Sequence, residues 1–197
     1  MNVFDFDKTI FNGDSTEKFY KYCLIKYPAV RKHIFSMAVA FAKYYILKKG
    51  TKTQCKEIFY RFLREIPDID KAVEDFWDKN GEGIFDWYKK LHKETDVVIS
   101  ASPEFLLEGF CKKLGVEKLM ASPVDKKTGL YNGENCHGKE KVRRFYEVYP
   151  DGVIENFYSD SVSDAPLAQI SKNAFVVDRH GKLSDWEKVF PGTKNII

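Results

Sequence analysis

The chain begins with a short apolar run that ends abruptly in acidic residues: Asn2-Val3-Phe4 is followed by Asp5-Phe6-Asp7. This pattern predicts a buried strand whose carboxyl end delivers two carboxylates. An isolated Asp-x-Asp is more often a solvated turn, but this one directly follows a strand at the start of an α/β pattern. Two carboxylates held close together are costly unless one is protonated or a cation lies between them. A hard divalent ion such as Mg²⁺, which prefers oxygen ligands, resolves the conflict.

Three more apolar runs read as buried strands, and two of them are followed by helical spacing, at 104–114 and 165–170. Strands alternating with helices predict a parallel sheet covered on both faces, so the expected fold class is α/β with a Rossmann-like core. In such sheets ligands bind beyond the carboxyl ends of the strands. The three runs are 96–100, 153–158 and 174–177.

Residues 13–90 differ in character, because they contain long helical patterns and no clear strand. We predict a helical cap domain over 13–90, inserted into a catalytic core made of 1–12 and 91–197. A β-hairpin over Met120–Glu134 is expected as an appendage of the core. The helical patterns of the cap are Thr16–Lys26, Ala29–Lys48, Lys52–Arg64 and Ile69–Leu91.

Hydroxyl groups follow the second predicted strand. Pro103 suits the first position of a helix, so Ser102 is expected to cap that helix. This assignment leaves Ser100, with the backbone amides of the turn, to hold a phosphate oxygen.

A lysine and two aspartates follow the later strands. The run from His137 to Val142 contains Lys139 and Lys141, and a phosphoryl-transfer site needs one fixed cation of this kind. We favour Lys141, because it precedes the apolar helix start. Asp160 and Asp164, four residues apart after a strand, can supply one metal ligand and one residue that orients it. In isolation the lysine would more readily be a solvated helix start, and the alternative for the aspartates is an acidic cluster that caps a helix.

The order of these motifs resembles that of the haloacid dehalogenase-like hydrolases. The helical insertion after the first motif, and the segment Asn135-Cys136-His137-Gly138 before the lysine, are similar to the phosphoserine phosphatase-like branch. The residues that match the family's four motifs are Asp5, Asp7, Thr9, Ser100, Lys141, Asp160 and Asp164.

The resemblance implies a Mg²⁺-dependent phosphatase acting on a small phosphorylated substrate. Asp5 would be the nucleophile that forms an aspartyl-phosphate, and Asp7 the general acid and base. Ser100, Thr9 and Lys141 would hold the phosphoryl oxygens. The implied metal residues are Asp5 through its carboxylate, Asp7 through its carbonyl, Asp160, and Asp164 as the residue that positions them.

The chain also departs from that branch. Lys8 replaces a small residue, as in some members acting on phospholipid-like substrates, and Ala101-Ser102 replaces Gly-Gly. Asp14 lies about where the branch places an acidic residue that meets the amino group of the substrate, but no arginine for its carboxylate is identifiable. Phosphoserine is therefore not favoured. The candidate substrate-binding residues are Thr9, Asp14, Ser100 and Ser102.

The segment Arg31–Lys49 is unusually apolar over Ile34–Ala42 and has basic residues on both sides. It is too short to span a bilayer, and we interpret it as a buried cap helix. The alternative is an interfacial helix serving a lipid-linked phosphate, such as phosphatidylglycerophosphate, at a membrane surface. A third alternative, a binding protein without turnover, is opposed by the presence of every motif residue.

Composition limits the remaining possibilities. A net charge of +3, from 32 Lys+Arg and 29 Asp+Glu, does not indicate a nucleic-acid-binding surface.

The N-terminus has no basic segment followed by an uninterrupted apolar run, so no signal peptide and a cytoplasmic location are expected. Oligomeric state stays open. Free thiols are expected because no pairing or zinc-like spacing links Cys23, Cys55, Cys111 and Cys136.

Overall fold

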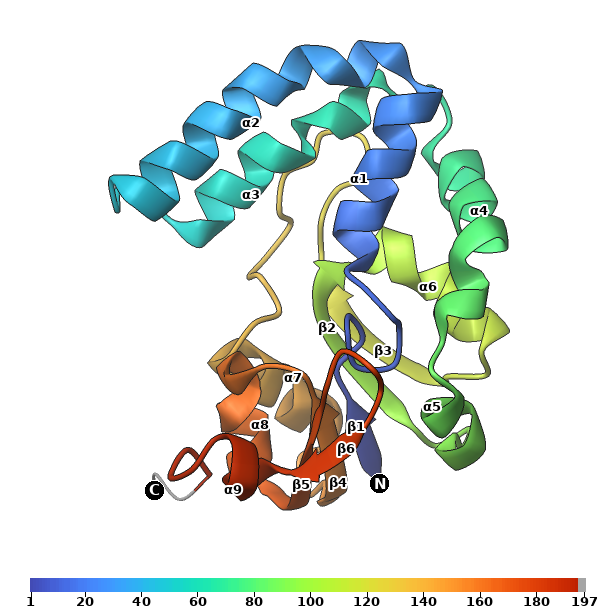
Figure 1. The fold of residues 1–197 in the computed structure, drawn as a ribbon, viewed down its shortest axis with the longest axis vertical. Coiled ribbons are helices and arrows are strands. Elements are labelled where there is room, and N and C mark those ends of the chain that lie inside the picture. Colours follow the sequence, from blue (N-terminus) through green and yellow to red (C-terminus); the bar gives the residue numbers. More distant parts are fainter. Residues whose placement is uncertain (195–197) are drawn as a thin grey trace.

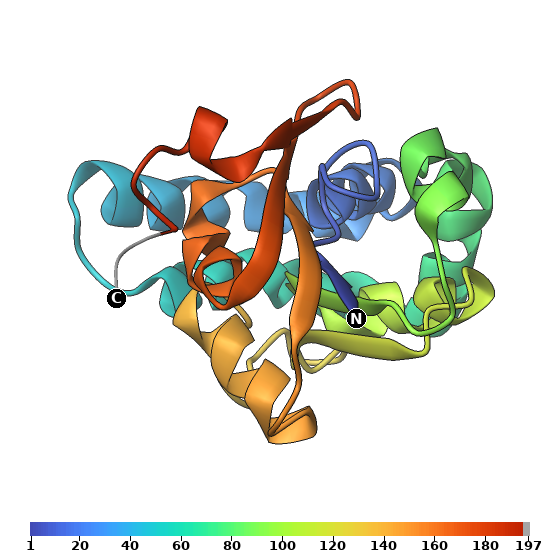
Figure 2. The same ribbon diagram turned by 90° about the horizontal axis from the view of Figure 1, so that it is seen from below.

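The computed structural model describes residues 1–194, which form a six-stranded sheet with helices on both faces (Figures 1 and 2). The strand order is β3-β2-β1-β4-β5-β6, with β6 alone antiparallel to its neighbour. The predicted α/β class is confirmed. The strands are β1 (Asn2–Phe4), β2 (Val97–Pro103), β3 (Lys118–Ser122), β4 (Ile154–Ser159), β5 (Ser171–Val177) and β6 (Leu183–Asp185).

Strand β1 lies at the centre of the sheet, between β2 and β4. From β1 the chain builds one half of the sheet outward through β2 and β3, then returns to build the other half from β4. Where the connections from two adjacent parallel strands run in opposite directions along the sheet, a crevice opens at the carboxyl ends of those strands. Ligands bind in such crevices of open α/β sheets. Asp5 and Asp7 follow β1 at this edge of the sheet.

The two faces of the sheet hold separate hydrophobic clusters. Successive side chains of a strand point to opposite faces, so Val3 lies in one cluster and Phe4 in the other. The Val3 cluster includes Phe145 of α7 (Lys139–Val148) and Leu167 of α8 (Ala165–Gln169). The Phe4 cluster continues into the aromatic side chains of the cap and of α6 (Glu104–Lys113).

The cap arches over the carboxyl edge of the sheet (Figure 1). Two of its longer helices begin at these side-chain caps: Asp14 accepts a hydrogen bond from the amide of Glu17, and Thr51 forms a reciprocal capping box with Gln54. The helical elements between β1 and β2 are α1 (Ser15–Lys26), η1 (Pro28–His33), α2 (Ile34–Phe41), the π-helical turn η2 (Ala42–Ile46), α3 (Lys52–Tyr60), η3 (Arg61–Glu65), α4 (Ile69–Asn80), η4 (Gly81–Gly83) and α5 (Asp86–Leu91).

The helix expected over Ile69–Leu91 is broken at η4, where the chain returns to the core. The amide of Phe85 donates to the carbonyl of Ile10 at 2.9 Å. Tyr88 of α5 then packs edge-on against Phe4, with ring centroids 5.1 Å apart. The domain boundary at residue 90 stays a prediction.

Two local predictions are wrong. Strand β2 continues through Pro103, which is itself the N-cap of α6, so Ser102 does not cap that helix. The expected hairpin is reduced to one antiparallel bridge between Val124 and Tyr131, because the first residues of that segment pair with β2 as part of β3. The rest is a loop that reaches the cap, where Arg64 donates to the carbonyl of Thr128 at 3.0 Å.

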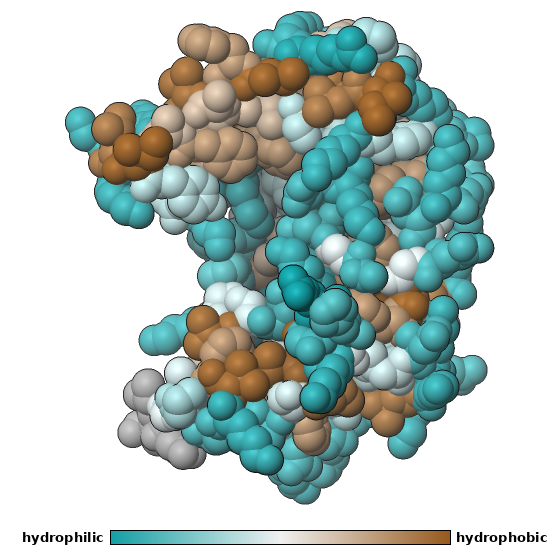
Figure 3. Space-filling view, in the orientation of Figure 1, coloured by the Kyte–Doolittle hydropathy of each residue, from teal (hydrophilic) through white to brown (hydrophobic). Residues whose placement is uncertain are grey.

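The prediction of a buried helix over Ile34–Ala42 is also wrong. In α2 only Met37 and Ala40 are buried, while Phe35 is 80% exposed. Figure 3 shows apolar side chains gathered on the outer surface of this arm of the cap. Among the described residues no helix is long and apolar enough to cross a membrane.

The cytoplasmic location stays a prediction. The four cysteines are all free and buried.

Candidate active site

Asp5 lies at the point where β1 leaves the sheet. Its amide donates to the carbonyl of Tyr158 at 2.9 Å and so extends the pairing with β4 by one residue. A tight turn follows, with Lys8 at a φ of 57°. This turn brings the hydroxyl of Thr9 back to within 3.4 Å of Oδ2 of Asp5. Backbone pairing and the turn therefore fix the orientation of the Asp5 carboxylate.

Lys141, in the first turn of α7, is the cation that contacts Asp5. Its Nζ atom donates to Oδ1 of Asp5 at 2.7 Å and to Oδ2 of Asp164 at 2.8 Å. Burial alone would lower the pKa of Lys141, but the charges of Asp164 and Asp5 raise it above its ordinary value. Burial raises the pKa of Asp5 to about 7, and the nearby Lys141 ammonium opposes that rise. Lys139 is exposed, so the structure brings Lys141, the favoured lysine, to the aspartates.

Asp7 has different surroundings. Its Oδ2 accepts a hydrogen bond from the hydroxyl of Ser102, and its Oδ1 accepts one from the amide of Ser15 at 2.6 Å. Burial raises the pKa of Asp7 to about 6, helped by the charge of Asp14, while the bonds from Ser102 and Ser15 act in the opposite direction. The two neighbouring carboxylates are thus held by unlike partners, a cation for Asp5 and neutral donors for Asp7.

The remaining predicted residues surround this pair. Ser100 is buried, and its hydroxyl accepts a hydrogen bond from the amide of Ser102 at 3.1 Å. Thr9 is fully buried behind the cavity, where its hydroxyl accepts from the amide of Asp160 at 3.0 Å. The structure therefore places Thr9 between two acidic residues. The predicted residues that line the cavity are Asp5, Asp7, Asp14, Ser100, Ser102, Lys141, Asp160 and Asp164.

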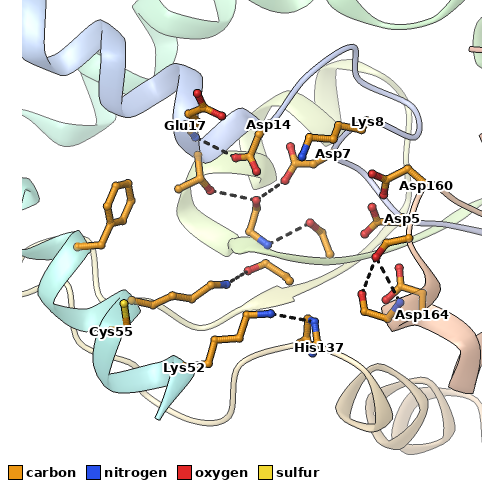
Figure 4. A pocket seen from close by; sticks show the side chains of 18 of the residues that line it. Asp5, Asp7, Lys8, Asp14, Glu17, Lys52, Cys55, His137, Asp160 and Asp164 are labelled. Carbon is orange, nitrogen blue, oxygen red and sulfur yellow. Dashed lines mark hydrogen bonds between the residues drawn. The ribbon is translucent and has the colours of Figure 1, made fainter. Parts of the chain in front are cut away.

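The cap supplies the opposite wall of this cavity, which has a volume of about 460 Å³ (Figure 4). Lys56 of α3 donates to the carbonyl of Ala101 at 3.1 Å and to Oδ1 of Asn135 at 3.0 Å. Lys52, one helical turn earlier, lies 3.0 Å from Nε2 of His137. Burial lowers the pKa of Lys56 to about 8. The aromatic residues of this wall are Phe41, Tyr45, Phe59 and Tyr60.

Sequence reasoning did not identify Lys52 and Lys56. Their spacing of four residues after the Thr51 cap places them on one face of a helix, which is the only signal that the sequence offers. Lysines with this spacing usually face solvent, so the pattern alone does not separate these two from others.

The acidic residues fit a magnesium ion. Asp164 accepts hydrogen bonds from Lys141 and from the hydroxyl of Ser159 at 2.8 Å on the same oxygen, and Asp5 and Asp160 also line the cavity. Within residues 1–194 no group of three or more His, Cys, Asp or Glu side chains forms a metal cage. Mg²⁺ does not need such a cage, because it binds through one or two carboxylates and keeps several waters. Burial raises the pKa of both Asp5 and Asp160, a cost that a bound cation would offset.

A parallel sheet with acidic residues after its central strand, closed by an inserted cap, defines a class of hydrolases. The family model for haloacid dehalogenase-like hydrolases matches residues 3–169, so the chain belongs to that family. The predicted family is confirmed.

The chain is also similar to individual proteins. The chain is 32% identical over 81 residues to Protein CicA of Caulobacter vibrioides, an alignment covering 38% of this chain and 36% of that protein. The chain thus spans about a third of the length of the curated relatives it matches. A Bordetella pertussis protein of unknown function has a TM-score of 0.70 at 18% identity, with 88% of this chain and 87% of that chain covered.

A phosphoserine phosphohydrolase-like protein from Francisella tularensis has a TM-score of 0.59 at 17% identity, with 91% of this chain and 88% of that chain covered. Cytosolic 5'-nucleotidase IIIB bound to cytidine has a TM-score of 0.60 at 14% identity, with 90% and 72% covered. At these identities the likeness is one of fold, and it confirms the resemblance to the phosphoserine phosphatase-like branch at that level.

Proposed function

We propose that the protein is a Mg²⁺-dependent phosphomonoesterase that uses Asp5 as its nucleophile. The observation that carries the proposal is the unlike setting of two adjacent carboxylates. Asp5 is paired with the buried ammonium of Lys141, whereas Asp7 is hydrogen-bonded by Ser102 and Ser15. Carboxylates with different surroundings can divide the roles of nucleophile and proton carrier.

In the proposed first step, a carboxylate oxygen of Asp5 attacks phosphorus and the bond from phosphorus to the leaving oxygen breaks. Asp7 gives its proton to that oxygen, so the alcohol departs neutral. In the second step, water attacks the aspartyl-phosphate, Asp7 takes a proton from the water, and inorganic phosphate leaves. Asp5 is then free for the next turnover.

Fixed positive charge would balance the transferring phosphoryl group. When bound, Mg²⁺ would neutralise phosphoryl oxygens and orient them for attack; Asp5, the carbonyl of Asp7 and Asp160 would hold it. Ser100 and Lys141 would contact the same oxygens. On the cap side, Lys52 and Lys56 would attract the anionic substrate.

A lipid-linked phosphomonoester is a second candidate substrate. Phe41 and Tyr45 line the cavity, and both side chains are exposed. Such a wall fits a substrate whose leaving group carries an apolar part, as well as a small water-soluble phosphomonoester.

The test is hydrolysis of a panel of phosphomonoesters with Mg²⁺ and with EDTA. The panel contains p-nitrophenyl phosphate, phosphoserine, a nucleoside monophosphate, a sugar phosphate and a lipid phosphate. We expect turnover that requires Mg²⁺ and disappears in Asp5→Asn, while Asp151→Asn, at an exposed turn, retains it. Turnover unchanged by EDTA or by Asp5→Asn, in a variant shown by circular dichroism to be folded, would refute the mechanism.

A further inference from the structure

One arm of the cap carries an exposed apolar surface, which we call the apolar cap face. It lies on α2 and the π-helical turn η2 (Figure 3). Phe35 is 80% exposed and Ile46 is 76% exposed. Contiguous exposure of this kind is unusual in a soluble monomer and marks an interaction surface. The large side chains of the apolar cap face are Ile34, Phe35, Val39, Phe41, Tyr45, Ile46 and Leu47.

Helical periodicity shows that this exposure is not the edge of a core-facing stripe. The inward row of α2 consists of Met37 and Ala40, which are buried. A solvent-facing helix places polar residues on the opposite side. Here Phe35 and Val39, four residues apart, lie on the side opposite to the buried residues, while Ile34 and Phe41 lie on the flank of the helix. The arm is therefore apolar on its inner and outer sides.

The segment that carries the apolar cap face is basic in sequence. Between Glu17 and Glu57 the chain has no aspartate or glutamate. The same stretch carries ten basic residues, of which Lys52 and Lys56 line the cavity and three are paired with carboxylates, namely Lys21, Lys26 and Lys32. The other five are Lys18, Arg31, Lys43, Lys48 and Lys49. Apolar side chains on an exposed helical arm with basic neighbours fit a surface that offers both hydrocarbon and negative charge.

We propose that the apolar cap face docks on an anionic lipid bilayer and lies in its interfacial layer. The segment is too short to cross a membrane, which agrees with the finding that no described helix could span one. A second copy of this chain fits less well, because a symmetric contact through the same face would bring the two basic stretches together.

The docking surface is continuous with the catalytic cavity. Phe41 and Tyr45 belong to the apolar cap face and also line the cavity. Docking therefore brings the mouth of the cavity to the lipid surface. This geometry holds whatever reaction the cavity carries out, so the docking does not rest on the proposed function.

The experiment is co-sedimentation of the full chain with vesicles of phosphatidylcholine alone and of phosphatidylcholine mixed with phosphatidylglycerol. We expect binding to the mixed vesicles that weakens with added salt, and much weaker binding to neutral ones. Phe35→Ser combined with Ile46→Ser should reduce the partition coefficient about tenfold or more, since each loses a side chain that would enter the interface. Both residues are exposed, so the fold should be retained.

Two further variants separate the contributions. Lys43→Glu with Lys49→Glu should abolish the preference for anionic vesicles, because both lysines are exposed beside the apolar cap face. Val153→Ser, at a 51% exposed apolar residue of the core, is the matched control and should bind like the parent chain.

Absence of binding to both vesicle types would overturn the proposal, as would binding that neither variant pair alters. A dimer seen by sedimentation equilibrium, dissociated by Phe35→Ser with Ile46→Ser and accompanied by no vesicle binding, would reassign the face to self-association. Repeating the sedimentation with Asp5→Asn keeps the tests apart, because docking should persist when turnover is lost.

Discussion

The ammonium nitrogen of Lys141 lies 2.7 Å from Oδ1 of Asp5, across 136 residues of sequence. Only 2% of the lysine side chain is exposed, and the same nitrogen also contacts Asp164. A buried cation shared by two carboxylates supplies the counter-charge that solvent would otherwise provide. Function and stability therefore depend on the same contact.

Replacing Lys141 by Met should leave Asp5 and Asp164 buried without their counter-charge. Breaking a buried ion pair by removing one partner typically costs about 3–5 kcal/mol, so we expect a loss of that order in the free energy of unfolding by urea. Turnover should also fall by several orders of magnitude. Lys139→Met, which removes an exposed lysine two residues earlier, should leave both quantities near their parental values.

Ser102→Ala should change how Asp7 titrates. The hydrogen bond from Ser102 lowers the pKa of Asp7, so its loss should raise that pKa above the present value of about 6. Because the protonated acid donates to the leaving group, the alkaline limb of the pH profile of kcat should move to higher pH. Maximal kcat should fall about tenfold as the orientation of the carboxylate is lost.

Ser163→Ala is the control for Ser102→Ala. Ser163 also lines the cavity, but its hydroxyl pairs with Ser161. A shift of the pH profile in both variants would contradict a specific role for Ser102.

The titration of Lys56 should weaken substrate binding at alkaline pH. Burial lowers its pKa from 10.5 to about 8, so the folded protein loses this positive charge above about pH 8. KM for an anionic substrate should then rise between pH 8 and 10, and Lys56→Arg should flatten the rise. Lys56 loses its proton at lower pH in the folded chain than in the unfolded chain. Its titration therefore raises the free energy of unfolding between pH 8 and 10. A loss of folded protein caused by this titration cannot account for the higher KM.

Gly129→Ala should loosen the contact between the core loop and the cap. Gly129 has a φ of +75°, and an added Cβ would lie 2.5 Å from the carbonyl oxygen of Tyr60. We expect the free energy of unfolding, measured by thermal denaturation, to fall by about 1–3 kcal/mol. Gly192→Ala is the matched control, with a φ of +74° and no atom within 4 Å of the added Cβ. Equal losses in the two variants would show that backbone strain alone is responsible.

Much of the catalytic core could be predicted from local pattern. An apolar run such as Asn2–Phe4 forms a strand wherever both of its faces are covered, and parallel strands align their carboxyl ends at one edge of the sheet. Asp5, Ser100 and Asp160 therefore had to meet there, whatever the details of the loops. Local pattern was misleading at Ser102, because its hydroxyl is used by Asp7 from another strand end rather than by its own helix.

The cap shows what sequence alone left open. The apolar residues of Ile34–Ala42 predict a helix, but hydrophobicity does not say which neighbour covers each side, and here the outer side is uncovered. The inward aim of Lys52 and Lys56 depends on how α3 packs over the sheet. The sequence by itself determined the elements and the order of the acidic residues, since both follow from local periodicity. The second wall of the cavity and the apolar cap face were decided by tertiary structure, because they arise only when distant segments pack together.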